Sequence, residues 1–263
     1  MSRPISQQVL RRYMEALLAG KRRACRAVIS AAVAQGLPAR QIYREVLWPA
    51  MEQVNSLYRQ DRINTATEHM ATRINRALAD QLQSLLPRSE PTGRRILITC
   101  ADGEPEELGA QMCADLFEAE GWEVYVVGGG VPNDEILSLV GQLRPEILLI
   151  FGTQPQGVPG VRRLIDLIRE VGANPSMNIM ISGGVFNRAE GLWQEVNADL
   201  FAPTAAEALR VAAAAGPRAV EAGPAAPRKK RRRRRSPYLE PIEGGVSVLA
   251  GQEHREIARW SAW

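Results

Sequence analysis

The sequence predicts an α/β protein in which an N-terminal four-helix bundle precedes a flavodoxin-like, doubly wound parallel sheet of five strands. Apolar residues recur at helical spacing as far as residue 87, whereas short apolar runs alternate with amphipathic segments between residues 94 and 215. A basic run that follows an Ala-, Gly- and Pro-rich linker sets the end of the chain apart. We therefore expect a bundle at 1–87, a Rossmann-like domain at 94–215 and a flexible basic tail at 216–263.

Four amphipathic segments with short connections indicate the bundle. Each segment is followed by a residue that ends helices, either a glycine or a proline, or by a turn. Pro49 falls inside the third segment and predicts a kink or a break there, because proline has no backbone N–H to donate. The expected helices cover about 5–18, 21–34, 39–58 and 66–86.

The start of the fourth helix allows two interpretations. Thr65 and Glu68 have the spacing of a capping box, in which both side chains satisfy amide groups at the helix start. Alternatively, Glu68 and the adjacent His69 contact a ligand. The helix dipole disfavours a charged imidazole near a helix N-terminus, so that His69 is expected to be neutral and able to touch a ligand.

The second half of the chain predicts five β-α units. Strands this apolar are covered on both faces, which indicates parallel pairing with helical crossovers in the order 2-1-3-4-5. Ligands of such sheets bind beyond the carboxyl ends of the strands, here near the loops 101–107, 152–159 and 183–188. The expected strands are 95–100, 122–127, 146–151, 178–182 and 198–202, and the expected helices are 106–120, 133–143, 159–171, about 189–196, and 204–215.

The residues of these loops exclude two classes of ligand. The first loop is acidic, with Glu104 and Glu106 among its carboxylates, and therefore repels a phosphate or a dinucleotide. A phospho-accepting receiver domain needs an Asp after the third strand, where this chain has Gly152-Thr153. A bulky neutral ligand remains, or no ligand at all. Paired glycines at Gly183-Gly184 fit either a ligand that approaches the backbone or a tight turn.

The charge of the chain is concentrated in its tail. The net charge is +4, and the run Arg228–Arg235 alone carries 8 positive charges, so the remainder is mildly acidic. Such a run attracts polyanions and predicts a contact with nucleic acid or an acidic surface. The apolar segment after it predicts docking on a partner or on the body of the protein, with His254 as a conceivable replacement ligand. Three cysteines without metal spacing, and no span or signal, indicate a cytoplasmic protein.

This arrangement of bundle and sheet resembles the cobalamin-binding modules of methionine synthase and, more closely, of light-dependent transcription regulators of the CarH type. The resemblance covers about residues 5–215. In the bundle, those regulators carry a Trp, nine further residues and Glu-His, and here Tyr58 stands at the same spacing before Glu68-His69. The Trp and Glu of the family pack around the upper ligand of cobalamin. The resemblance thus implies Tyr58, Glu68 and His69 as cofactor contacts, with His69 a candidate metal ligand.

The sheet domain of that family carries D-x-H-x-x-G after its first strand, and the His binds cobalt from below. Here the matching residues run from Glu104 to Gly109. The glycine is kept, Glu104 replaces the Asp, and Glu106 replaces the His. A carboxylate is a poor substitute for imidazole on this metal.

Two further positions of the family pattern lie after the third and fourth strands. The family's Ser, which faces the nucleotide tail of cobalamin, falls near Phe151 or Gly152 and is absent. The glycine pair is present as Gly183-Gly184. The resemblance therefore implies Gly152, Thr153, Gly183 and Gly184, together with Glu104, Glu106 and Gly109, as residues around a cofactor.

Modules with a similarly altered motif occur in the AerR/PpaA group of anti-repressors, which are described as binding cobalamin or haem through other residues and as acting on a partner repressor. This chain also shows no DNA-binding helix-turn-helix and no catalytic constellation. The resemblance implies a non-enzymatic sensor or regulator that binds cobalamin, haem or another tetrapyrrole and acts on a protein partner, with a homo-oligomer left open.

Two alternatives stay beside this interpretation. One is an interaction protein that keeps the fold, has lost the ligand, and uses its tail to bind nucleic acid or an acidic partner. The other is a corrinoid methyl carrier, which needs the lower His more than the other two functions do. The replacement of that His by Glu106 weighs against the carrier.

Overall fold

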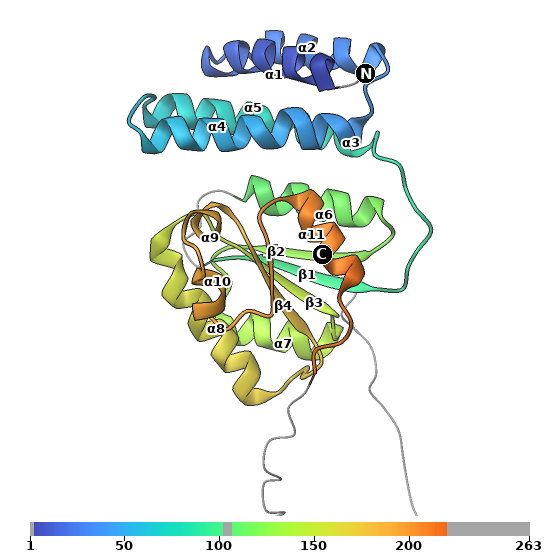
Figure 1. Cartoon of the computed structure of the whole chain (residues 1–263), viewed down its shortest axis with the longest axis vertical. Helices are drawn as coiled ribbons and strands as arrows, with labels where there is room; N and C mark the ends of the chain where they lie inside the picture. The colour runs from blue at the N-terminus through green and yellow to red at the C-terminus, as the bar shows by residue number, and fades with distance from the viewer. Residues whose placement is uncertain (1–2, 102–106, 220–263) are drawn as a thin grey trace, which may run out of the picture. The chain divides into compact units, whose positions relative to one another are not determined.

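The N-terminal part of the computed structural model is helical, as predicted (Figure 1). The structure describes residues 3–101 and 107–219. The long helices of this part are α1 (Arg3–Leu18), α2 (Arg22–Ala34), α4 (Trp48–Arg59) and α5 (Thr65–Gln83).

The predicted break in the third helix is present, and its form is a π-helical turn. Helix α3 (Ala39–Ile42) passes into the π-helix η1 (Tyr43–Leu47), whose end is marked by a bond from the Trp48 N–H to the carbonyl of Tyr43. Helix α4 then begins with Trp48-Pro49. Leu47 is itself helical, with φ −69° and ψ −46°, so the π-helical turn lies within a continuous helical segment, directly before a proline that cannot donate a backbone hydrogen bond.

The start of α5 corrects one interpretation of the sequence. The cap is Asn64, whose Oδ1 accepts a hydrogen bond from the Thr67 N–H at 2.9 Å. Thr65 is already the first helical residue, so Thr65 and Glu68 do not form a capping box. Asn and Thr are both good capping residues, and the choice shifted the expected start by one residue.

The predicted sheet is confirmed. It contains five strands in the order β2-β1-β3-β4-β5, and every neighbouring pair is parallel. Strands β1, β3 and β4 are buried almost throughout, as expected of strands covered on both faces, whereas β2 forms a more exposed edge. The strands are β1 (Arg95–Cys100), β2 (Glu123–Gly128), β3 (Ile147–Phe151), β4 (Asn178–Ser182) and β5 (Leu200–Ala202).

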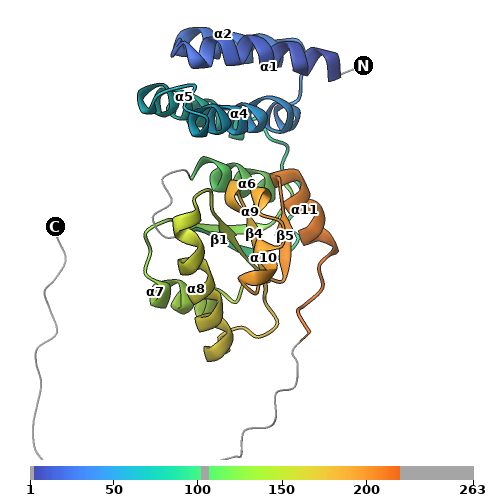
Figure 2. The same cartoon turned by 60° about the vertical axis from the view of Figure 1, so that its left-hand side comes forward.

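Helices cover both faces of the sheet (Figure 2). One face packs against α6 (Leu108–Ala119) and α11 (Ala205–Ala214), and the other against α7 (Asn133–Leu143) and α8 (Val158–Val171). A short 3₁₀ turn, η2 (Pro155–Gly157), precedes α8. The prediction of a loop at 183–188 was wrong, because α9 (Gly184–Arg188) begins directly after Gly183. The short helix expected at about 189–196 is present as α10 (Leu192–Glu195), which is only one turn long.

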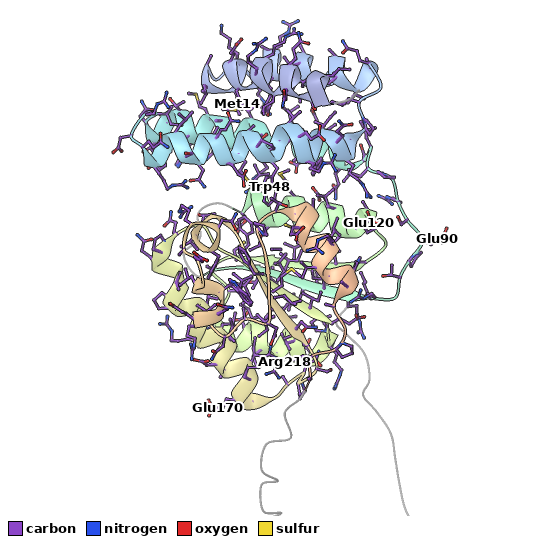
Figure 3. All side chains as sticks on the ribbon, viewed as in Figure 1. Met14, Trp48, Glu90, Glu120, Glu170 and Arg218 are labelled. Carbon is purple, nitrogen blue, oxygen red and sulfur yellow. The ribbon has the colours of Figure 1, made fainter. Side chains whose placement is uncertain are left out.

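Bundle and sheet share one continuous apolar core. Trp48 lies on the side of α4 that faces α6 (Figure 3), and its ring meets that of Phe151 edge to face with centroids 6.5 Å apart. The hydroxyl of Tyr43 lies 2.9 Å from Oδ2 of Asp115 on α6. Arg40 and Glu120 add an ion pair between the two parts. The bundle is therefore packed onto the sheet face that α6 covers.

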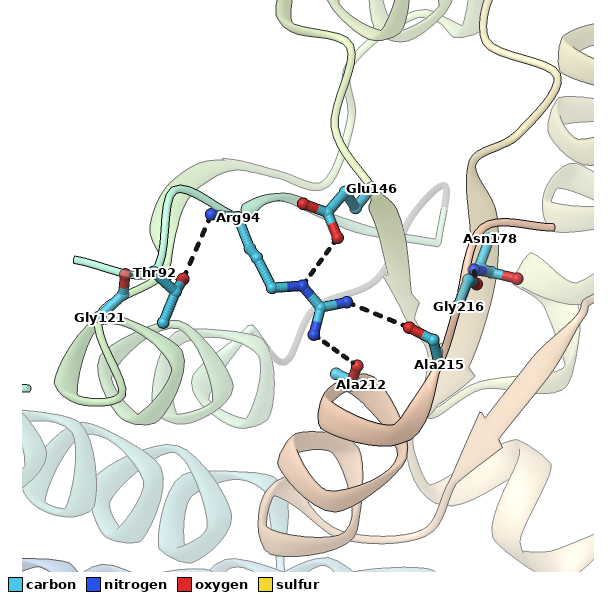
Figure 4. Close-up of polar contacts among 8 residues, drawn as sticks. All are labelled: Thr92, Arg94, Gly121, Glu146, Asn178, Ala212, Ala215 and Gly216. Carbon is cyan, nitrogen blue, oxygen red and sulfur yellow. Dashed lines mark hydrogen bonds and ion pairs between the residues drawn. The ribbon is translucent and has the colours of Figure 1, made fainter. Parts of the chain in front are cut away.

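The amino ends of the strands are closed by a cluster around Arg94 (Figure 4). Its guanidinium donates to the carbonyls of Ala212 and Ala215 at the end of α11, pairs with Glu146, and stacks over the ring of Trp122. The segment after α11 continues along this edge, where Asn178 donates to the Gly216 carbonyl. These contacts cover the amino ends of the strands, whereas ligands of such sheets bind at the carboxyl ends.

The cysteines, the possibility of a membrane-spanning helix and the C-terminal tail were further points of the sequence analysis. The three cysteines are buried, as expected of small apolar residues, and they form no disulfide within the described residues. None of the helices in the described ranges has the length and apolar character needed to cross a membrane. The predictions for Arg228–Arg235, His254 and the apolar docking segment lie outside the described residues.

Candidate functional site

A cavity of about 610 Å³ lies where α4 and α5 of the bundle meet the segment that follows β3. This volume falls in the range of about 300–1,000 Å³ that is usual for small-molecule and cofactor sites. Its lining joins residues that are about 100 positions apart in the sequence. They are Met51, Asn55, Tyr58, Glu68, His69, Thr72, Arg73, Arg76, Thr153 and Gln154.

Four residues singled out from the sequence line this one cavity: Tyr58, Glu68, His69 and Thr153. Tyr58 is the last aromatic residue of α4, and its hydroxyl lies 3.1 Å from Oγ1 of Thr65 at the start of α5. The spacing that matches Tyr58 to Glu68-His69 in sequence therefore corresponds to two helix ends that meet across a short turn.

Glu68 is held toward the cavity by its own helix. Its Oε1 accepts a hydrogen bond from Thr72 Oγ1 at 3.1 Å, and its Oε2 lies 3.5 Å from Nε2 of His69. The Glu68 side chain is 18% exposed, whereas that of His69 is 64% exposed. Because Asn64 caps the helix, the Glu68 carboxylate is not part of the cap, and it lines the cavity instead.

The sequence analysis missed several polar residues of the lining: Asn55, Thr72, Arg73, Arg76 and Gln154. The signal was the helical period. Met51, Asn55 and Tyr58 follow one another at spacings of four and three on α4, which places them on one face. His69, Thr72 and Arg76 do the same on α5. Helical spacing from Tyr58 and Glu68-His69 therefore indicates the other polar residues of the lining, once those three residues are taken as cofactor contacts.

The glycines of the sheet domain that were expected around a cofactor have packing roles. A Cβ on Gly109 would lie 2.1 Å from Cζ of Phe151, so that only glycine lets this ring rest on α6. Gly183 has φ +105°, and a Cβ there would lie 2.2 Å from the Gly152 oxygen. Gly184 lies beside the guanidinium of Arg188. Of the two interpretations of Gly183-Gly184, this geometry fits the tight turn.

The acidic loop is described only at its ends. Glu104 and Glu106 lie outside the described residues. Glu107 is described, and its Oε1 accepts a hydrogen bond from the Gly129 N–H at 2.7 Å, in the turn after β2. This carboxylate therefore holds the turn. Within residues 3–101 and 107–219, no group of three or more His, Cys, Asp or Glu side chains is arranged to bind a metal ion.

Residues 9–83 match the model of one B12 binding domain, and residues 94–213 match the model of another. The chain contains two B12-binding domains. The first corresponds to the helical bundle and the second to the five-stranded sheet with its helices. The cofactor of these domains is cobalamin.

Curated relatives of the two B12-binding domains are distant. Dimethylamine corrinoid protein 1 of Methanosarcina acetivorans is 22% identical over 206 residues, which cover 77% of this chain and 95% of the relative. Monomethylamine corrinoid protein 2 of Methanosarcina barkeri is 24% identical over 190 residues, or 69% of this chain and 85% of the relative. The solved structure of the Methanosarcina barkeri monomethylamine corrinoid protein covers 78% of this chain with a TM-score of 0.70 at 21% identity, a likeness of fold.

The cavity fits the macrocycle of cobalamin on the bundle side. The edge of a corrin ring carries neutral amides, which accept and donate hydrogen bonds, and the cavity offers amide, hydroxyl and guanidinium groups to them. Met51 and the ring of Tyr58 supply apolar surface. His69, the one histidine within the described residues, also lines the cavity.

Proposed function

We propose that this chain is a non-enzymatic, cytoplasmic regulatory protein that binds cobalamin between its two B12-binding domains and acts through a protein partner. The observation that carries the proposal is the composition of the cavity. Eight of its lining residues come from α4 and α5, and Thr153 and Gln154 come from the sheet domain. A ligand in such a cavity touches both domains and changes the free energy of their contact.

The lining residues take distinct roles in this proposal. Tyr58 and Met51 would supply apolar contacts to the macrocycle, and Glu68 and His69 would supply polar ones, with His69 as the candidate metal ligand. Asn55, Thr72 and Thr153 bond to the edge amides. When bound, cobalamin supplies a cobalt–carbon bond that is sensitive to light and to reduction. In this proposal the residues of the cavity would hold and orient the cofactor.

The contacts beside the cavity offer a route to a partner. Tyr43 and Trp48 stand at the two ends of η1 and bind Asp115 and Phe151 of the sheet domain. A ligand that moves α4 by a small amount must also move these contacts, because packed interfaces change between discrete arrangements. The bundle surface presented to a partner would then report the state of the cofactor.

A second candidate function is that of a corrinoid carrier, which the names of the dimethylamine and monomethylamine corrinoid proteins favour. The sequence disfavours it, because Glu106 stands where the resemblance places the cobalt-binding His. The ligand-free alternative, with Arg228–Arg235 bound to nucleic acid or an acidic partner, is supported by the charge of that run alone.

The first experiment is to purify the full chain with cobalamin supplied and to record its visible spectrum in the dark and after illumination. Hydrogen exchange then compares the free and loaded protein. The regulatory proposal expects a coloured protein and protection that extends from α4 and α5 to α6, which lies outside the cavity. The variant Tyr58→Ala serves as a control, because it should lose both colour and protection.

The outcomes separate the candidates. A protein that stays colourless with both cobalamin and haem contradicts the proposal and favours the ligand-free scaffold. A loaded protein without protection at α6 contradicts the coupling between ligand and interface. A loaded protein that takes up a methyl group and passes it on to an acceptor with a methyltransferase added favours the carrier.

A further inference from the structure

Phe151 occupies the crevice in which an open α/β sheet usually takes its ligand. This crevice lies at the carboxyl ends of β1 and β3, where the strand order reverses. Phe151 is the last residue of β3, and its side chain is only 2% exposed. A Cβ on Gly109 would come within 2.1 Å of its ring, so the ring fills the space between β3 and the first turn of α6.

The ring is held there from the bundle side as well. Trp48 meets Phe151 edge to face, with an angle of 88° between the two planes and 6.5 Å between centroids. Trp48 is itself buried, with 5% of its surface exposed, and its indole N–H donates to Glu52 at 3.0 Å. Phe151 is therefore enclosed by α6 on one side and by α4 on the other.

A buried hydroxyl lies beside the ring. Ser182 ends β4 and pairs in register with Phe151 and with Ala202. Its side chain points to the same face of the sheet as Phe151, because Met180, two residues earlier, is part of the core on that face. Ser182 is fully buried, and its Oγ has no hydrogen-bond partner within the described part of the chain. Buried polar groups are nearly always paired, so this hydroxyl marks a floor on which a polar ligand group would fit if the ring were smaller.

We propose that Phe151 keeps the nucleotide tail of cobalamin out of the sheet domain, so that this chain binds the corrin ring alone and accepts corrinoids irrespective of their tail. In this proposal the corrin ring binds in the cavity lined by Tyr58, Glu68 and His69, and the nucleotide tail stays outside the crevice that Phe151 fills. The inference rests on the binding of cobalamin but not on the regulatory role. It makes Phe151 a specificity-determining residue.

The test compares cobalamin with cobinamide, a corrinoid that lacks the nucleotide and its base. Spectral titrations of the full chain give a dissociation constant for each. If the tail makes no contact, the two constants should agree within about threefold, since no apolar surface of the tail is buried. A preference of more than about tenfold for cobalamin means that the tail is bound, and it overturns the inference. If neither corrinoid binds, the inference and the cofactor assignment fail together. If cobalamin binds and cobinamide does not, only the inference fails and the cofactor assignment stands.

Variants extend the test to the crevice itself. Phe151→Ala should open the space above Ser182 and create a preference for cobalamin over cobinamide. The double variant Phe151→Ala/Ser182→Ala should reduce that preference, because it removes the hydroxyl at the floor. Phe117→Ala, a buried phenylalanine of α6 that contacts Trp122, is the matched control and should leave the ratio at the wild-type value. An unchanged ratio in a folded Phe151→Ala protein contradicts the assignment, and the wild-type ratio decides the question if that variant does not fold.

Discussion

The hydroxyl of Tyr43 lies 2.9 Å from Oδ2 of Asp115 and 2.7 Å from the carbonyl oxygen of Ala79. A hydroxyl carries one proton and can donate only once. When Tyr43 donates to Ala79, the bond to Asp115 needs a proton on the carboxyl group. Burial raises the pKa of Asp115, although the bonds from Gln111 and Tyr43 oppose that effect. The contact that joins the bundle to α6 is therefore sensitive to protonation.

Replacing Tyr43 with Phe should destabilise the protein by about 1–3 kcal/mol, because it leaves a buried carboxyl group without one of its partners. Urea unfolding of the wild type and the variant measures the loss. Tyr125→Phe, at the edge strand β2, is the control and should leave the midpoint unchanged. Equal midpoints for Tyr43→Phe and the wild type would show that this bond does not contribute to the stability of the fold.

Asp115 should make the protein less stable as the pH rises. Burial raises its pKa in the folded protein above the usual aspartate value, so the folded state holds the proton more tightly than the unfolded state. This contribution is complete below the unfolded pKa and is lost as the pH rises through the folded pKa. The Asp115→Asn variant lacks the titrating group.

The measurement is the difference in unfolding free energy between the wild type and Asp115→Asn at several pH values from about 4 upward. The wild type should lose stability relative to the variant over this range. Asp80 and Glu118 also act on Asp115 and raise its pKa, so both residues stay unchanged in the comparison. A difference that is constant with pH would contradict the raised pKa.

Substitutions at Asn64 and Glu68 should have different effects, the first on stability and the second on cofactor binding. Asn64→Ala removes the cap of α5 and should cost about 1 kcal/mol of stability, without a direct effect on the cofactor. Glu68→Gln should leave stability near the wild-type value but weaken cobalamin binding, because the carboxylate lies in the cavity. Thermal unfolding and spectral titration of both variants test the pair. The assignment fails if Glu68→Gln destabilises the helix as much as Asn64→Ala does.

His69 and His254 are the two histidines of the chain, and they provide a matched pair for cofactor binding. His69→Ala should weaken cobalamin about two- to tenfold, the effect of losing one hydrogen bond or weak ligand contact. His254→Ala should leave the affinity unchanged. The opposite result, with His254 as the sensitive position, would indicate that the tail supplies the ligand.

Gly183 should tolerate no side chain. Gly183→Ala combines φ +105° with an overlap on the Gly152 oxygen at 2.2 Å, and backbone strain alone costs about 1–3 kcal/mol. Gly130→Ala has a similar positive φ of +73° but nothing within 4 Å of the added methyl group, so it should cost only about 1–2 kcal/mol. Unfolding free energies of the two variants measure the difference, and equal losses would remove the role of the close approach.

The sequence predicted the sheet well because its signal is local. Apolar runs and the helices between them are visible in windows of about ten residues, and parallel pairing follows from their burial. The spacing from Tyr58 to Glu68-His69 identified part of the cavity for a similar reason, since these residues lie on two consecutive helices, α4 and α5, joined by a short turn.

The closing of the crevice was not predictable in this way. Phe151 reads as the end of an apolar strand, and only the folded chain brings Gly109 and Trp48 against it from 42 and 103 positions away in sequence. The cap at Asn64 was missed because Thr65 beside it is also a good capping residue, and α9 was missed because it begins at a glycine pair, which is equally typical of a turn. Long-range packing and close local alternatives are the two limits that this chain illustrates.

The π-helical turn at Tyr43–Leu47 sets the rotation of everything that follows it in the bundle. An α-helix advances by about 100° per residue, and a π turn holds about one residue more than an α turn. Shortening η1 by one residue would restore a regular helix and turn α4 by about a quarter of a circle. Trp48 would then face away from Phe151, and Met51, Asn55 and Tyr58 would leave the cavity together. The one extra residue of the π-helical turn thus sets the rotation of α4 that places Trp48 against Phe151 and Met51, Asn55 and Tyr58 in the cavity.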